Sequence, residues 1–126
     1  MSEPLRGIVL AHADLAAALV GAARVILGDD TGLTPLSNAG CDRAGIAARI
    51  EAAVGAGPAL IFTDLAGGSC TTVAATVARD RPELRVLAGV NLGMLLEFAC
   101  HRGEPLESVA ERVAVAGRTA IREVGR

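Results

Sequence analysis

The chain has 126 residues, enough for a single hydrophobic core, and we expect residues 1–126 to form one domain. Its formal net charge of −2 gives no electrostatic reason to expect nucleic acid or an anionic membrane surface as a partner. No apolar run reaches the roughly 18 residues of a membrane-spanning helix, and the N-terminus lacks the features of a secretory signal. We therefore expect a cytoplasmic protein without direct membrane insertion.

Short apolar runs alternate with longer amphipathic segments along the chain. The apolar runs predict strands at 6–11, 33–36, 59–63 and 84–90. The segments between and after them predict helices at about 14–27, 42–54, 69–80, 92–101 and 105–122. This alternation is typical of α/β proteins, in which helices cover a parallel sheet.

Two of the predicted strands end at residues that carry chemistry. His12 directly follows the run at 6–11, and Asp64 directly follows the run at 59–63. Apart from Arg6 and Thr63, both runs are apolar, as expected for strands buried on both faces. In such sheets the ligand crevice lies outside the carboxyl ends of the strands. If the two strands are neighbours, the imidazole and the carboxylate lie at one crevice.

A histidine paired with a carboxylate suits phosphoryl transfer. An unprotonated ring nitrogen of His12 is a nucleophile near neutral pH and can carry a phosphoryl group. Asp64 on the other ring nitrogen would fix the tautomer and stabilise the positive ring that forms during transfer. Each residue also has a structural explanation. A strand-end histidine can bond to backbone, and an aspartate can cap a helix or form a turn.

The residues after Asp64 favour an anion site. Gly67 and Gly68 would let backbone amides approach a phosphate, and the following helix start would direct its positive end at it. Ser69 could add a hydroxyl donor. The alternative is an ordinary loop whose serine caps a helix.

The remaining composition excludes several other chemistries. Cys41, Cys70 and Cys100 form no CxxC motif, so we expect neither a disulfide framework nor a zinc site. No metal ion and no organic cofactor is implied. All twelve basic residues are arginine, which excludes Schiff-base chemistry and a P-loop lysine. Receiver domains carry phosphate on an aspartate after their third strand, but they need a lysine and an acidic pair after the first strand, where this chain has His12 and Ala13.

Three segments together resemble the IIA component of the mannose-type phosphoenolpyruvate-dependent sugar phosphotransferase system. They read GIVLAH at 7–12, TDLAGGS at 63–69 and AGVNLGMLLE at 88–97. The resemblance spans essentially the whole chain. It implies an α/β fold, a three-layer α/β/α sandwich around a mainly parallel sheet of four to five strands, and a homodimer.

The resemblance also implies an activity, protein histidine phosphoryl transfer. His12 would accept a phosphoryl group from the phosphocarrier protein HPr and pass it to a histidine of a IIB component. Asp64 would orient the His12 ring, and Gly67, Gly68 and Ser69 would hold the phosphate. Asn91, expected beside the same crevice, would have a supporting role.

The chain departs from the usual family pattern at four positions. Where the family commonly has glycine, proline, asparagine and proline, this chain has Ala13, Cys70, Thr72 and Gly93. None of these departures removes the nucleophile or the residue that orients it. They affect the loops and the surface that partners would contact.

Three other readings of the sequence stay open. The protein could be a regulatory module that is phosphorylated on His12 and acts by binding a target. It could be the phosphotransfer subunit of dihydroxyacetone kinase, whose fold is similar, although the segments at 67–69 and 89–91 look more like the sugar system. It could also be a degenerate fold that binds a small anion, against which the retention of His12, Asp64 and Ser69 argues.

Overall fold

A four-stranded sheet forms the centre of the computed structural model, which describes residues 3–125. Its strands are β1 (Arg6–Ala11), β2 (Leu33–Ser37), β3 (Ala59–Thr63) and β4 (Leu84–Ala88). They lie in the order β2-β1-β3-β4, and each pair of neighbours is parallel. Strands β1 and β3, which precede His12 and Asp64, are therefore neighbours and form the central pair of the sheet.

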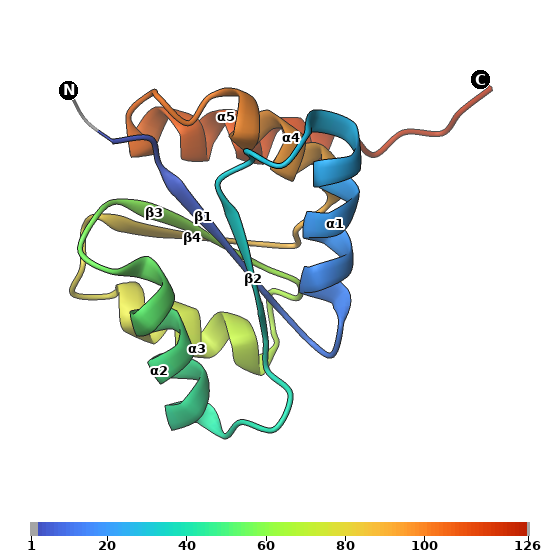
Figure 1. Ribbon diagram of the computed structural model, residues 1–126. Helices are drawn as coiled ribbons and strands as arrows, with labels where there is room; N and C mark the ends of the chain where they lie inside the picture. Colours follow the sequence, from blue (N-terminus) through green and yellow to red (C-terminus); the bar gives the residue numbers. More distant parts are fainter. Residues whose placement is uncertain (1–2, 126) are drawn as a thin grey trace.

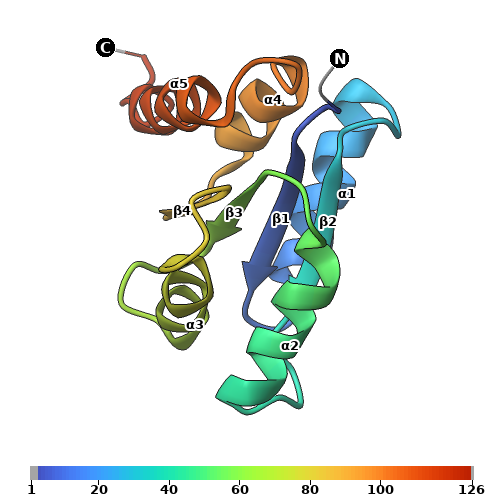
Figure 2. The same ribbon diagram turned by 90° about the vertical axis from the view of Figure 1, so that its left-hand side faces the viewer.

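Helices cover both faces of this sheet. In the described residues they are α1 (Leu15–Leu27), α2 (Arg43–Val54), α3 (Ser69–Ala78), α4 (Leu92–Cys100) and α5 (Leu106–Thr119). The first, fourth and fifth helices lie on one face, and α2 and α3 lie on the other (Figures 1 and 2). The expected three-layer α/β/α sandwich is confirmed, with four strands in its sheet.

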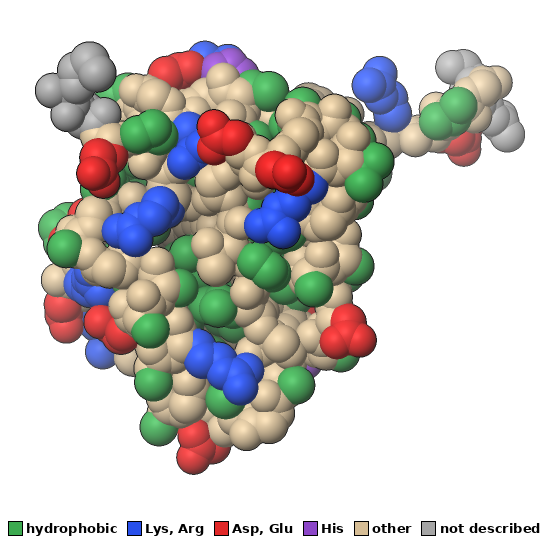
Figure 3. All heavy atoms as spheres, in the orientation of Figure 1, with side chains coloured by type: hydrophobic (Ala, Val, Ile, Leu, Met, Phe, Trp, Pro, Cys, Tyr) green, Lys and Arg blue, Asp and Glu red, His purple; other side chains and the backbone are tan. Residues whose placement is uncertain are grey.

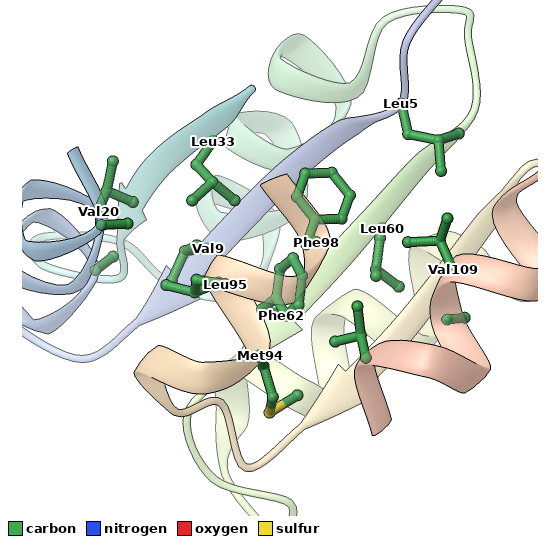
Figure 4. Close-up of a cluster of buried hydrophobic side chains, with 14 of the residues drawn as sticks. Leu5, Val9, Val20, Leu33, Leu60, Phe62, Met94, Leu95, Phe98 and Val109 are labelled. Atoms are coloured by element: carbon green, nitrogen blue, oxygen red, sulfur yellow. The ribbon is translucent and has the colours of Figure 1, made fainter. Parts of the chain in front are cut away.

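Side chains of the central strands alternate between two separate cores. Val9 and Phe62 pack under α1, α4 and α5, whereas Ile8 and Ile61 pack under α2 and α3. Every residue of β3 is buried, which explains why its sequence is continuously apolar and does not alternate. Phe62 of β3 meets Phe98 of α4 edge to face, with ring centroids 5.5 Å apart (Figure 4).

Several predicted boundaries were wrong, among them the end of α3, which lies at Ala78 and not at residue 80. The last helix ends at Thr119 instead of continuing to Arg122, because Ile121 is 80% exposed and has little packing to hold a further turn. Strand β4 ends at Ala88 instead of Val90, because Gly89 adopts a positive φ of 80° that turns the chain out of the sheet.

The helices are 9 to 14 residues long, and charged side chains are spread over the face drawn in Figure 3. Among residues 3–125, no helix combines the length and apolar character that crossing a membrane requires. Arginine and acidic side chains are interspersed over the face in Figure 3, and neither sign gathers into one patch there.

Gly7 of β1 lies where α4 approaches the sheet closely. A Cβ at this position would lie 2.7 Å from Cε2 of Phe98 and 2.8 Å from Cδ2 of Leu33.

We expect Gly7→Ala to lower the free energy of unfolding by about 1–3 kcal/mol through overpacking, measured by urea denaturation. Gly21→Ala in α1 is the control, since its Cβ would meet nothing within 4 Å and should raise helix stability by up to about 1 kcal/mol. Equal effects of the two substitutions would contradict close packing at Gly7.

Candidate functional site

The register of the sheet brings His12 and Asp64 together. Strands β1 and β3 are parallel, with Leu10 opposite Thr63, so the residues that follow each strand emerge side by side. Oδ2 of Asp64 lies 2.7 Å from ring atom Nδ1 of His12. The same oxygen also accepts a hydrogen bond of 2.9 Å from the backbone N–H of His12. One carboxylate oxygen thus holds both the backbone and the ring.

This contact decides which ring nitrogen is available for chemistry. An ionised carboxylate only accepts hydrogen bonds, so Nδ1 of His12 carries the proton that it donates to Asp64. In the neutral ring the lone pair then resides on Nε2. The His12 side chain is 46% exposed, whereas that of Asp64 is only 12% exposed. The orienting carboxylate is therefore shielded while the imidazole faces solvent.

The electrostatic state of Asp64 follows from two opposing effects. Burial raises the pKa of its carboxyl. The hydrogen bonds from the backbone and the ring of His12, together with the charge of that ring, lower this pKa by more than burial raises it. The resulting pKa lies below the ordinary value of 3.8, so Asp64 is ionised at neutral pH. Its second oxygen, Oδ1, is buried and has no hydrogen-bond partner in the described part of the chain.

The Gly67-Gly68-Ser69 segment also reaches the histidine. Gly68 is the N-cap residue of α3, and a Cβ on it would lie 3.4 Å from Cε1 of the His12 ring. A Cβ on Gly67 would meet nothing within 4 Å. Ser69 is the first residue of α3, and its hydroxyl has no hydrogen-bond partner within residues 3–125. The positive end of the α3 dipole therefore lies beside the imidazole.

Two threonines that the sequence analysis did not single out hold this loop. Thr71 Oγ1 donates to the carbonyl of Leu65 at 2.6 Å, which leaves the buried Thr63 hydroxyl to donate to Thr71 Oγ1 at 2.6 Å. Gly68 N–H donates to the same Leu65 carbonyl at 2.9 Å. The sequence signal was a threonine at the end of an otherwise apolar strand, because such a hydroxyl needs a partner when it is buried.

Asn91 follows β4, but its side chain is engaged elsewhere. Its Oδ1 accepts from Met94 N–H at 3.1 Å and so caps α4, and its Nδ2 donates to the carbonyl of Gly117 in α5 at 3.1 Å. These bonds join α4 to α5. The supporting role at the crevice stays a prediction.

His12, Asp64 and Cys70 are the described residues whose donor atoms come close enough to suggest a metal ion, all within 4.8 Å of one another. Burial and the negative charge of Asp64 both raise the pKa of the Cys70 thiol, so it stays protonated at neutral pH. Nδ1 of His12 is already bonded to Asp64. These contacts favour a hydrogen-bonded pair beside a buried thiol over a preformed metal centre.

Solved structures share this fold over nearly the whole chain. The phosphotransferase system component EIIA from Streptococcus agalactiae is 22% identical, with a TM-score of 0.89 over 94% of this chain and 96% of that one. The mannose/sorbose specific IIA subunit from Enterococcus faecalis is 26% identical, with a TM-score of 0.88 over 98% and 97%. A IIA protein associated with the fucose utilization operon of Streptococcus pneumoniae is 18% identical, with a TM-score of 0.80 over 98% and 96%.

Comparison of the sequence with protein families identifies the family of the chain. No curated protein matches the chain. The family model described as the fructose IIA component of the phosphotransferase system matches residues 7–115, a stretch that contains every residue of the candidate site. The chain belongs to this family of phosphotransferase system IIA components.

Proposed function

We propose that the protein is a phosphoryl carrier of a phosphoenolpyruvate-dependent sugar phosphotransferase system. His12 accepts a phosphoryl group from HPr and passes it to a histidine of a IIB component. The observation that carries the proposal is the 2.7 Å contact between Asp64 Oδ2 and Nδ1 of a half-exposed imidazole. A homodimer, which the family resemblance implies, stays a prediction.

The first transfer forms one P–N bond and breaks another. The lone pair on Nε2 of His12 attacks the phosphorus of phosphohistidine in HPr, and the HPr ring keeps the electron pair of the broken P–N bond. As the bond to Nε2 forms, the ring of His12 becomes positively charged. The ionised Asp64 beside Nδ1–H stabilises that charge. The second transfer repeats this exchange with the IIB histidine as nucleophile.

The phosphate needs its own partners. We assign this role to the backbone amides of Gly67 and Gly68, the hydroxyl of Ser69 and the positive end of α3. The closeness of Gly68 to the His12 ring supports this assignment, because it places the start of α3 where a phosphoryl group on the ring could reach it. The family match does not favour the regulatory or dihydroxyacetone kinase alternatives.

Phosphorylation by phosphoenolpyruvate, enzyme I and HPr tests the function directly. Intact mass spectrometry under alkaline conditions should show one added phosphate, which acid removes. His12→Ala should abolish the label because it removes the nucleophile. His101→Ala is a matched control, since His101 is the chain's other histidine and bonds to Glu97 at the end of α4. Full labelling of His12→Ala would overturn the assignment.

Asp64→Asn should slow the transfer on the order of 10²- to 10⁴-fold, because the ring loses the charge that orients and stabilises it.

The Asp64→Asn substitution should also make the fold less stable at neutral pH. Ionised Asp64 stabilises the folded state above its ordinary pKa of 3.8, and this contribution is lost as pH falls through the lower folded-state pKa. Urea denaturation at several pH values should therefore show the difference from the unsubstituted protein shrinking in acid. A difference that grows in acid would contradict the lowered pKa.

Gly68→Ala should slow transfer by roughly tenfold, because its methyl group would press on the Leu65 carbonyl oxygen at 3.3 Å while it contacts Cε1 of His12 at 3.4 Å, so the loop has to shift beside the ring. Gly67→Ala should have little effect, because a Cβ there meets nothing within 4 Å. Both substitutions keep the backbone amides, so single-turnover transfer rates separate crowding of the ring from loss of anion donors. Equal rates for the two variants would argue against close contact between Gly68 and the ring.

A further inference from the structure

Ala13, the residue after His12, has an unusual backbone conformation. Its φ is +52°, and it is the non-glycine residue with positive φ in the part of the chain that the structure describes. This left-handed conformation is unfavourable for an alanine because its Cβ crowds the backbone. Such a conformation persists only where neighbouring groups hold it.

Two side chains from the end of β2 hold both backbone polar groups of Ala13. Asn38 Oδ1 accepts a hydrogen bond from Ala13 N–H at 3.2 Å. The hydroxyl of Ser37 donates to the carbonyl oxygen of Ala13 at 2.7 Å. Strand β2 pairs with β1 on the side opposite β3, so these contacts lie across β1 from Asp64.

Further hydrogen bonds hold the backbone of Ser37 and Asn38 and the Ser37 hydroxyl. Ala11 is the register partner of Ser37, and its carbonyl accepts a bond of 3.2 Å from Asn38 N–H. The Ser37 hydroxyl accepts from Ala39 N–H at 3.0 Å, and the carbonyl of Ser37 accepts from the guanidinium of Arg49 in α2. The end of β2 is therefore a hydrogen-bonded support for the loop after β1.

The contact with Asn38 acts directly on the backbone of His12. The N–H of Ala13 and the carbonyl of His12 belong to one peptide plane. Asn38 bonds to the N–H end of this plane, and Leu15 N–H donates to its carbonyl end at 3.2 Å. Asp64 holds the preceding N–H of His12. The backbone on both sides of the imidazole is thus fixed.

We propose that Ser37 and Asn38 are positioning residues, which hold Ala13 in its left-handed conformation and thereby fix the His12 ring for phosphoryl transfer. This inference rests on the proposed function. Transfer requires Nε2 to meet the phosphorus in line, and small displacements of a reacting group cost large factors in rate. Asp64 accepts the hydrogen bond from the ring and so fixes the ring's orientation. Ser37 and Asn38, together called the clamp, fix the conformation of the backbone from which the ring projects.

A double-mutant cycle between Asn38→Ala and Ala13→Gly tests the proposal. Glycine adopts positive φ freely, so the clamp matters less in the Ala13→Gly background. We expect Asn38→Ala alone to lower kcat for transfer from HPr by about ten- to a hundredfold with KM for HPr unchanged. In the Ala13→Gly background the same substitution should cost much less.

Ser37→Ala should behave as Asn38→Ala does, and it keeps the test decisive if one variant fails to fold. Ser108→Ala, on the exposed surface of α5, is the matched control and should transfer normally. The thermal unfolding temperature of each variant shows whether it is folded. A variant that unfolds at the normal temperature but transfers slowly has a misplaced ring.

Two outcomes would overturn the inference. If Asn38→Ala slows transfer equally with alanine and with glycine at position 13, the effect of Asn38 on transfer does not depend on holding the left-handed conformation of Ala13. If Asn38→Ala and Ser37→Ala transfer at the normal rate, the clamp has no role. Failure of the unsubstituted protein to accept phosphate would instead overturn the proposed function, so the two failures are distinguishable.

Discussion

The site depends on one carboxylate oxygen. Asp64 Oδ2 accepts from both the backbone N–H and the ring of His12, so the ends of the two central strands are joined through a single atom. This arrangement requires β1 and β3 to be adjacent and parallel with the register observed, since a shift of one residue would turn one side chain to the opposite face. The apolar cores on both faces of the sheet enforce that register. The packing of Ile8, Val9, Ile61 and Phe62 therefore serves the site as well as the stability of the fold.

The sequence predicted the parts of the structure that follow from periodicity and from strand ends. The continuous apolar runs at 6–11 and 59–63 predicted buried parallel strands, and their final residues predicted that His12 and Asp64 would meet. It failed where tertiary contacts decide the outcome. The end of α5 at Thr119 depends on missing neighbours for Ile121, and the engagement of Asn91 with Gly117 depends on how α4 meets α5. No local pattern encodes either contact.

The backbone after His12 shows the same limit more sharply. An alanine in this position gives no signal of positive φ, because the residue types that favour it are glycine, asparagine and aspartate. Ser37 and Asn38 lie beyond the strand predicted at 33–36, and only the pairing of β1 with β2 brings them to Ala13. Their contribution could not be read from a sequence in which they are separated from His12 by a whole helix.

The residues that depart from the family pattern fit into the structure in different ways. Cys70 is buried in the core under α2 and α3 and behaves as a small apolar residue, while the Thr72 hydroxyl bonds back to the Gly68 carbonyl at 3.2 Å within the first turn of α3. Neither demands an unusual backbone. Ala13 differs, because its conformation is one that a glycine would adopt without strain. The strain lies directly after His12, where contacts from a third strand hold it. The position of the imidazole is therefore a property of three adjacent strands: β1 carries His12, β3 orients its ring, and β2 fixes the backbone that follows it.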